Sequence, residues 1–286
     1  MKSADFAYLR PDSLDGVFAA LARYGEEAQI LAGGQTLMAL QNMRLSAAEV
    51  LVDINRVPGL SGIAEAPDHL RIGALTRYSE IGASALVRSH APLLSDAVPF
   101  IAHAAIRNRG TVGGSLALGD PAAEMPACAL ALGAELELSA AAGTRTVRAE
   151  DFYLGLYETA LRPGEVLTAV CVPKAGPAQV RAIDEIVRRR GDFALAGLAV
   201  AGDAADGRLV SVRLSLFGVA DRPVLAAGAM ARLEGQALRD DTIDAARDAV
   251  LDAVRPADDP AAPAGYRRHV AGVLTRRVLT RLRERV

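Results

Sequence analysis

Two glycine pairs carry the residue types in this sequence that could bind a ligand. One lies in Ile30-Leu-Ala-Gly-Gly-Gln-Thr-Leu37 and the other in Thr111-Val-Gly-Gly-Ser115. Glycine has no Cβ atom, so the main chain at such a pair can approach a ligand closely, and successive N–H groups beside a helix start favour a diphosphate. Each segment is therefore a candidate phosphate cradle.

Small hydroxyl and acidic residues near the two pairs indicate what else the ligand contains. Thr36 follows the first pair, Ser115 follows the second, and Asp120 and Glu124 come soon after. Hydroxyl groups would bind phosphate oxygens, and a carboxylate would accept hydrogen bonds from sugar hydroxyls. Together these residues favour a ligand with two phosphates and a ribose.

A simpler interpretation of each feature stays open. A glycine pair taken alone is more typical of a tight turn that binds no ligand. Asp120 precedes Pro121 and could serve only as a turn initiator, and Glu124 could be a solvated helix start.

Several function classes are disfavoured by motif and charge. Neither pair forms the G-x-G-x-x-G dinucleotide pattern, and no Gly-Lys-Ser/Thr follows either of them, so ATP hydrolysis is disfavoured. The 32 Lys and Arg residues against 34 Asp and Glu give a formal net charge of -2, which indicates no polyanionic partner and disfavours nucleic acid as a ligand.

The two cysteines disfavour a metal centre within this chain. Cys128 and Cys171 stand apart, without a C-x-x-C pattern or a nearby histidine pair, so the sequence offers no ligand set for an iron–sulfur cluster or a structural zinc ion. We expect two buried thiols, and any metal of the working enzyme on another polypeptide.

The elements that must position the glycine pairs follow from hydrophobic periodicity. The pattern predicts a helix over 13–25, a strand over 29–32, a helix over 36–43 and a strand over 50–54. After a restart near residue 60 it predicts a strand over 69–74, a helix from 91 to about 106, a helix over 125–133, and strands over 134–138 and 166–172.

A proline- and glycine-containing linker at 173–177 separates this part from a C-terminal domain. There the pattern predicts strands over 182–190, 194–201 and 209–219, followed by three helices. The fold class is α+β, with two mixed α/β units and a C-terminal domain of antiparallel sheet and helices. The expected boundaries are 1–57, 58–176 and 177–286.

The location is expected to be cytoplasmic. The first residues lack the basic flank and apolar run of a secretory signal, and no stretch of about 18 uncharged apolar residues appears, so we expect no membrane span.

The motifs resemble those of a known family. The segments A-G-G-Q-T (32–36) and I-R-N-R-G-T-V-G-G-S-L-A-x-x-D-P-A-A-E-x-P (106–126) resemble the FAD-binding medium subunit of the xanthine oxidase and carbon monoxide dehydrogenase family of molybdenum hydroxylases. The resemblance extends over nearly the whole chain and includes the segments 6–11 and 266–277. It implies an FAD-binding domain of the vanillyl-alcohol oxidase type.

The resemblance also implies which residues bind FAD. Both glycine segments would wrap the diphosphate, and Glu124 would hold a sugar hydroxyl. Ile101 and Leu167 match apolar positions that flank the flavin, although core packing is an equally good interpretation of both. The implied FAD-binding residues are Ile30, Leu31, Ala32, Gly33, Gly34, Gln35, Thr36, Leu37, Ile101, Thr111, Gly113, Gly114, Ser115, Asp120, Glu124 and Leu167.

The surroundings of the flavin ring are implied by a third segment. Arg190-Gly-Asp-Phe-Ala194 resembles the family's loop over the isoalloxazine ring, so Phe193 would shield that ring, while a buried Phe at a strand start is the alternative. Many relatives carry a lysine near the flavin where this chain has Glu185. The arginines at 188–190 could supply the missing positive charge, but adjacent arginines are more typical of a solvated or subunit-facing edge.

The implied function is electron transfer within a larger enzyme. The family places the molybdenum cofactor on a large subunit and [2Fe-2S] clusters on a small subunit, in a dimer of heterotrimers, and FAD passes the electrons to an external acceptor. The last helix is expected to present a basic side to these partners rather than to a membrane surface. Its arginines are Arg267, Arg268, Arg276, Arg277, Arg281, Arg283 and Arg285.

Two other interpretations remain open. A free-standing FAD-dependent oxidoreductase of the vanillyl-alcohol oxidase type shares the general fold, but such enzymes usually carry a catalytic cluster, and the four histidines here are scattered. The second interpretation is a nucleotide-binding scaffold that catalyses no reaction. A yellow protein absorbing near 450 nm would exclude the scaffold, and co-purification with molybdenum and iron–sulfur subunits would exclude the free-standing enzyme.

Overall fold

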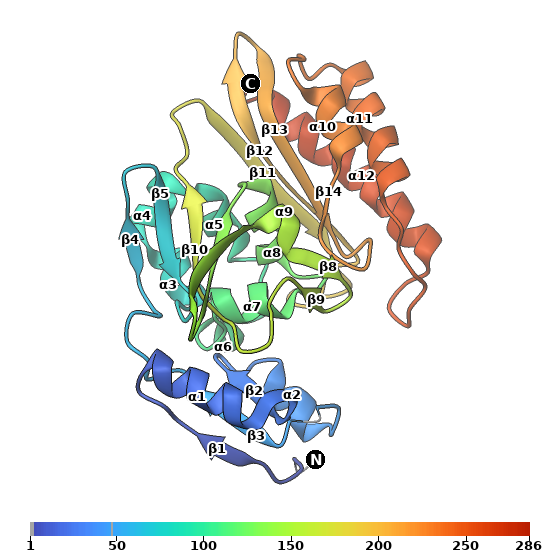
Figure 1. Cartoon of the computed structure of the whole chain (residues 1–286). Helices are drawn as coiled ribbons and strands as arrows, with labels where there is room; N and C mark the ends of the chain where they lie inside the picture. Colours follow the sequence, from blue (N-terminus) through green and yellow to red (C-terminus); the bar gives the residue numbers. More distant parts are fainter. Residues whose placement is uncertain (1–2, 47) are drawn as a thin grey trace.

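Three main β-sheets follow one another along the chain in this computed structural model, which describes residues 3–46 and 48–286. A small N-terminal unit packs below a central unit, and a C-terminal sheet with three helices on its outer face completes the molecule (Figure 1). The observed class is therefore α+β, as the sequence predicts.

The N-terminal sheet is parallel and has the order β1 (Ala7–Leu9), β3 (Val50–Asp53), β2 (Ala28–Leu31). All residues of the middle strand β3 are buried, which explains its continuous apolar run. Helix α1 (Leu14–Tyr24) begins at Ser13, whose hydroxyl accepts from the Gly16 N–H, and packs Val17 into the same core. Helix α1 and strands β2 and β3 were predicted, whereas β1 is short and largely exposed and has no periodic signal.

The central sheet is antiparallel throughout and is lined on one face by short helices. Its core joins Leu70, Ile72, Leu136 and Val170 of the strands to apolar residues of the helices. The strands, in spatial order, are β4 (Ile63–Glu65), β5 (His69–Gly73), β10 (Val166–Pro173), β6 (Glu135–Ala140) and β7 (Gly143–Arg148). The helices are α3 (Tyr78–Ala83), α4 (Ala85–His90), α5 (Pro92–Ala97), α6 (Ala104–Arg107), α7 (Val112–Leu118), α8 (Glu124–Ala131) and α9 (Ala149–Phe152). A small hairpin of β8 (Tyr153–Gly155) and β9 (Glu158–Thr159) follows.

The helix predicted from 91 to about 106 is wrong, because the segment is broken into α5 and α6. Pro99 has no N–H to continue the helical hydrogen bonds, and Ala102 has a positive φ of 40° that no helix accommodates. The segment between the two helices is instead a turn held by Arg107, whose Nη1 donates to the carbonyls of Ile101 and Ala102 at 2.8 and 2.9 Å.

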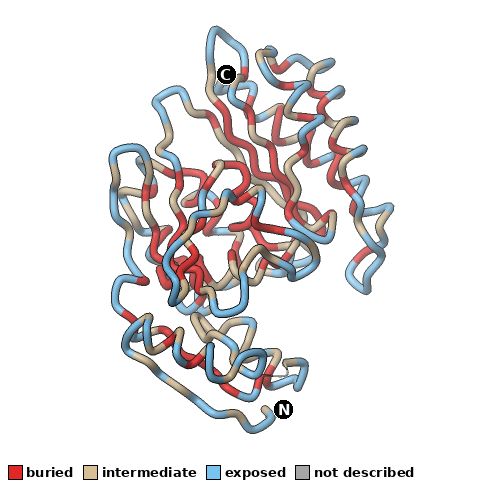
Figure 2. Tube along the Cα trace, viewed as in Figure 1, coloured by how far each residue is buried: buried red, intermediate tan, exposed pale blue. Residues whose placement is uncertain are grey.

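The C-terminal sheet is an antiparallel meander of β11 (Gln179–Ile186), β12 (Ala196–Ala205), β13 (Arg208–Phe217) and β14 (Val224–Leu225). Three helices follow it, namely α10 (Ala227–Leu233), α11 (Asp240–Ala253) and α12 (Ala264–Arg283). The sheet lies between these helices and the central unit, so β12 and β13 have long buried runs (Figure 2). The strand predicted over 182–190 ends earlier, at Ile186, since exposed arginines at 188–190 belong to a loop.

The boundaries expected from the sequence fall between these sheets. Strand β3 ends at Asp53 and β4 begins at Ile63, while β10 ends at Pro173 and β11 begins at Gln179. We therefore propose 1–57, 58–176 and 177–286 as the structural units. Among the described residues, no helix combines the length and the apolar character that a bilayer crossing requires.

One glycine fixes how α7 packs on the central sheet. A Cβ added to Gly113 would lie 2.4 Å from the Ala74 Cβ and 2.7 Å from the Ala74 Cα, and the Gly113 N–H donates to the Ala74 carbonyl at 2.8 Å. Gly113→Ala should push α7 away from residue 74 and lower the free energy of unfolding by about 1–3 kcal/mol in urea unfolding. Gly176→Ala, where an added Cβ meets nothing, is the control; equal stability of the two variants would contradict this packing.

Candidate functional site

The two glycine segments lie side by side although they are distant in sequence. A Cβ added to Gly33 would lie 2.4 Å from the Arg109 carbonyl oxygen and 3.0 Å from the Gly110 Cα. One added to Gly114 would lie 3.8 Å from the Ala32 Cβ. The loop between β2 and α2 (Leu37–Asn42) and the start of α7 therefore form one surface, as a single shared ligand requires.

The first segment presents a run of free main-chain donors. Gly34 has a positive φ of 70°, and the Gln35 amide donates back to the Gly33 carbonyl at 3.0 Å, which shapes the loop. Within residues 3–46 and 48–286, nothing accepts a hydrogen bond from the five amide groups of residues 33–37. Five successive donors in a glycine-bearing loop are what phosphate oxygens need.

The second segment is built differently from what the sequence suggests. Gly113 and Gly114 lie in the first turn of α7, and the N–H groups of residues 112–114 are already bonded. Val112 donates to the Thr76 carbonyl at 3.1 Å, Gly113 donates to Ala74, and Gly114 donates to the Thr111 hydroxyl at 3.1 Å. The amides of this segment are therefore not free as those of the first segment are, and Gly113 allows close packing against Ala74. A contact of Gly113 and Gly114 with the cofactor stays a prediction.

The hydroxyl residues near the two glycine pairs also differ in whether their side chains already have a partner. Thr111 is the N-cap of α7, and its hydroxyl accepts from the Gly114 N–H, so it has an internal partner. Thr36 precedes α2 without any side-chain capping bond. The Thr36 hydroxyl is therefore available to a phosphate, and phosphate binding by Thr111 and Ser115 stays a prediction.

A polar network behind the first loop was not predicted from the sequence. The Asn55 amide donates to the Ala32 carbonyl at 2.8 Å, and Arg77 donates from Nη2 to the Asn55 Oδ1 at 2.6 Å and from Nη1 to the Arg109 carbonyl. Arg77 thus ties the first loop to the segment before α7. These residues come from separate elements and form no local motif, so sequence reasoning missed them.

Asp53 anchors this network at the end of β3. Its Oδ1 accepts from the main-chain N–H of Asn55 at 2.9 Å, and its other oxygen is hydrogen-bonded by Tyr8 and lies 3.3 Å from the Arg10 Nε. Burial acts to raise the pKa of Asp53, but the bonds from Tyr8 and Asn55 and the charge of Arg10 hold it below its usual range. Asp53 is therefore ionised at neutral pH.

The two acids after α7 are both buried. Asp120 accepts from the Ala122 N–H at 2.9 Å, so its role as a turn initiator is confirmed, and its second oxygen lies 3.5 Å from the Tyr157 hydroxyl. Glu124 is only 9% exposed at the first position of α8, so the solvated helix start is wrong. Burial, with a smaller contribution from the charge of Asp120, raises the pKa of Glu124 to about 7.

A third acid approaches from the C-terminal domain. Glu185 lies on β11, and burial followed by the negative charges of Glu124 and Asp184 raises its pKa to about 8. Its Oε2 is buried and has no hydrogen-bond partner among the described residues. A buried polar atom without a partner is typical of a place that a ligand completes, so FAD, which carries both donors and acceptors, fits this junction.

The loop at 187–193 follows the strand that carries Glu185 and contacts the central unit. A Cβ added to Gly191 would lie 2.6 Å from the His103 ring, so the loop touches the turn before α6. Phe193 is 67% exposed, which excludes the buried strand-start alternative.

The two apolar residues expected near the flavin, Ile101 and Leu167, are packed in the central core. Core packing is therefore confirmed for their side chains, and a cofactor contact stays a prediction.

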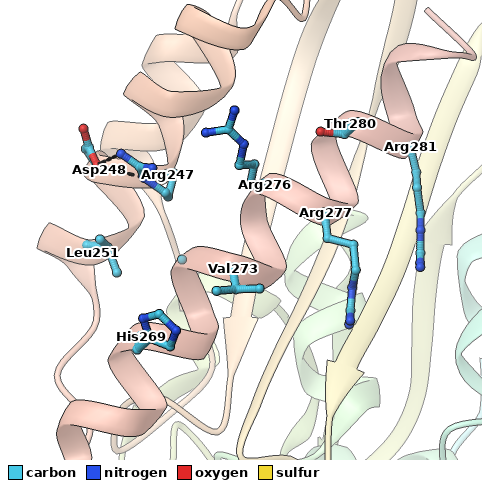
Figure 3. Close-up of a pocket in the computed structure, with 10 residues that line it drawn as sticks. Arg247, Asp248, Leu251, His269, Val273, Arg276, Arg277, Thr280 and Arg281 are labelled. Atoms are coloured by element: carbon cyan, nitrogen blue, oxygen red, sulfur yellow. Dashed lines mark hydrogen bonds and ion pairs between the residues drawn. The ribbon is translucent and has the colours of Figure 1, made fainter.

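A groove elsewhere on the surface is a separate feature. It lies between α11 and α12, has a volume of about 640 Å³ and carries much of the basic side predicted for the last helix (Figure 3). Its guanidinium groups are paired: Arg247 lies 2.8 Å from Asp248, and Arg277 and Arg281 lie 2.9 and 2.8 Å from Asp184. The groove contains none of the glycine segments, so it is not the candidate ligand site.

Two family models match the chain in succession. Residues 4–175 match the FAD binding domain in molybdopterin dehydrogenase, and residues 181–282 match the CO dehydrogenase flavoprotein C-terminal domain.

Individual proteins match over nearly their full length. The carbon monoxide dehydrogenase medium chain of Afipia carboxidovorans is 37% identical over 100% of this chain and 99% of its own. The nicotine 6-hydroxylase medium subunit of Paenarthrobacter nicotinovorans is 35% identical over 98% of each chain. A solved structure of carbon monoxide dehydrogenase from Hydrogenophaga pseudoflava, lacking the Mo-pyranopterin moiety of its cofactor, superposes with a TM-score of 0.98 at 36% identity, covering 100% of this chain and 99% of the other.

The Arg77 network should govern ligand affinity from behind the loop. Arg77→Met leaves the Asn55 amide and the Arg109 carbonyl without their partner, so we expect FAD to bind about tenfold more weakly in a fluorescence titration. Arg88→Met is the matched control, since Arg88 also donates to a main-chain carbonyl, that of Gly82, but on α4. Equal affinities of the two variants would refute this role.

The raised pKa of Glu185 predicts that the folded state loses stability as the pH rises. The folded state holds a proton on Glu185 up to about pH 8, whereas the unfolded chain loses it near the ordinary value of 4.5, so stability falls as pH rises between these values. Glu185→Gln removes the penalty and should raise the free energy of unfolding by about 1 kcal/mol at pH 9, after allowance for solvent screening.

Urea unfolding at pH 4 and pH 9 checks this expectation. The variant should match the wild type at pH 4, and Glu26→Gln, a control outside the site, should match it at both values. A Glu185→Gln protein that gains nothing at pH 9 would count against a buried, protonated Glu185.

Proposed function

Because the chain belongs to the family of FAD-binding medium subunits of molybdopterin-dependent dehydrogenases, we propose that it is the electron-transfer subunit of a heterotrimeric molybdenum hydroxylase. In this function the chain holds one FAD between iron–sulfur clusters of a partner and an external acceptor. The observation that carries the proposal is the run of five free amides at residues 33–37, at a junction that also gathers buried acids.

Each part of the site has a task in holding the cofactor. The amides of the first loop and the Thr36 hydroxyl bind the diphosphate, and Glu124 accepts a hydrogen bond from a sugar hydroxyl. The loop at 187–193 covers the ring and presents Phe193 toward it. Bound FAD supplies the capacity to accept electrons singly or in pairs, and the protein controls its position and the access of water and oxidants.

Metal chemistry is assigned to partner chains in this proposal. Cys128 is buried within α8, and the Cys171 thiol donates to Glu137 at 3.3 Å. Burial raises the pKa of both thiols, that of Cys171 to about 12, which disfavours the thiolate that iron ligation needs. We therefore infer a small subunit with [2Fe-2S] clusters and a large subunit with the molybdenum cofactor, assembled as a dimer of heterotrimers.

The names of the relatives support a subunit role and leave the substrate open. Carbon monoxide dehydrogenase and nicotine 6-hydroxylase both contain a medium subunit that matches this chain from end to end. The two enzymes are named for very different substrates, carbon monoxide and nicotine, although their medium subunits both resemble this chain. We infer that another subunit recognises the substrate. The cytoplasmic location stays a prediction from the sequence.

Co-expression with the neighbouring subunits tests the proposal. The tagged chain should co-purify with a molybdenum-containing and an iron–sulfur subunit, carry one FAD per chain absorbing near 450 nm, and be reduced when substrate is added to the complex but not to the chain alone. A chain that binds FAD and oxidises a substrate without partners would instead establish the free-standing oxidoreductase. A colourless chain in a purified complex would exclude both.

A further inference from the structure

Arg267 is buried, in contrast to the other arginines of the last helix. The sequence grouped it with the basic, partner-facing side of α12, but it is only 7% exposed, while its neighbour Arg268 is exposed. It lies in the first turn of α12 and points into the domain. A buried guanidinium is tolerated only when it is paired and hydrogen-bonded, so its partners indicate what it does.

Those partners come from three different segments. Nη1 donates to the Leu195 carbonyl at 2.9 Å and the Gly218 carbonyl at 3.0 Å, and lies 3.4 Å from the Ala194 carbonyl. Nη2 donates to the Asp259 Oδ2 at 2.6 Å. The guanidinium therefore joins the start of β12, the turn after β13 and the loop before α12.

Two of these segments lead directly to the proposed flavin site. Ala194 follows Phe193, and the Leu195 N–H donates to the Ile186 carbonyl at 2.8 Å, which closes the base of the 187–193 loop. The Gly218 N–H donates to the Pro121 carbonyl at 2.7 Å, in the segment that carries the acids. Arg267 thus holds the covering loop and the acidic segment from a single point.

The crowding at this point explains why a cation is needed. Gly218 has a positive φ of 74°, and a Cβ added to it would lie 2.7 Å from the Ala194 carbonyl oxygen. Carbonyl oxygens that converge in a buried place repel one another unless a donor lies between them, and a charged donor is the stronger kind.

We propose that Arg267 is a positioning residue that sets the covering loop and the acidic segment around the flavin, acting through main-chain carbonyls without touching the cofactor. The inference rests on the proposed function for its ligand. Its structural part, that Arg267 holds the base of the 187–193 loop, stands on the contacts alone.

The full-length chain with two readouts tests the inference. The first is the rate of trypsin cleavage after the exposed arginines 188–190, followed by mass spectrometry, which needs no cofactor. The second is FAD affinity together with iodide quenching of bound-flavin fluorescence. For Arg267→Gln we expect about tenfold faster cleavage, about tenfold weaker FAD binding and stronger quenching, because buried carbonyls lose their donor.

Matched variants separate positioning from general destabilisation. Val278→Ala removes buried core contacts of the same helix and should lower thermal stability without changing cleavage or quenching. Arg267→Lys should recover part of both properties, since an ammonium group can serve the same carbonyls. Should Arg267→Gln fail to fold, Asp259→Asn is the substitute variant. It removes the charge that pairs with the guanidinium but leaves Arg267 itself in the chain, and the same two readouts apply.

The outcomes are distinct. Faster cleavage and weaker binding in Arg267→Gln but not in Val278→Ala supports the inference. The inference is overturned if cleavage and FAD binding change in every variant in proportion to its loss of stability. It is also overturned if Arg267→Gln has the wild-type cleavage rate and FAD affinity. A wild-type chain that binds no FAD refutes the proposed function, while the cleavage readout still decides whether Arg267 holds the loop.

Discussion

The close approach of the first glycine loop to the main chain before α7 is the constraint on which the site depends. Gly33 leaves no space for a side chain against the Arg109 carbonyl, and Arg77 bonds that same carbonyl while its other nitrogen reaches Asn55. The N-terminal unit is thereby held on the central unit at the place where the free amides are presented. The geometry of the amides is set by this packing, since the loop itself has few internal bonds.

Much of the fold could be predicted because most elements are amphipathic or continuously apolar. Strand β3, helix α1 and the three final helices follow directly from spacing. The break between α5 and α6 could not be predicted from apolar spacing, which continues through Pro99, although that proline was a usable signal. Arg267 was misjudged because burial of one arginine among seven depends on carbonyls that lie far away in sequence.

For a related reason, the sequence could locate the two glycine pairs but could not show which of their main-chain amides are free. The two glycine pairs look alike in sequence, yet the amides of one are free and those of the other are bonded to Ala74, Thr76 and Thr111. Whether a glycine serves a ligand or a packing contact is decided by what the rest of the chain brings against it. The bond from Arg77 to Asn55 escaped prediction similarly, since these two residues meet only after the first two units dock.

The site is thus assembled from two sides that the fold controls independently. The side with the first loop is fixed by Arg77, whereas the covering loop and Glu185 belong to the C-terminal domain. The negative charge of Glu124 contributes to the raised pKa of Glu185 across this junction, so the charge presented to a bound flavin depends on how closely the two sides approach. Arg267 bonds the Gly218 turn that contacts Pro121, and the packing of α12 is therefore connected to the electrostatics of a site that the helix does not touch.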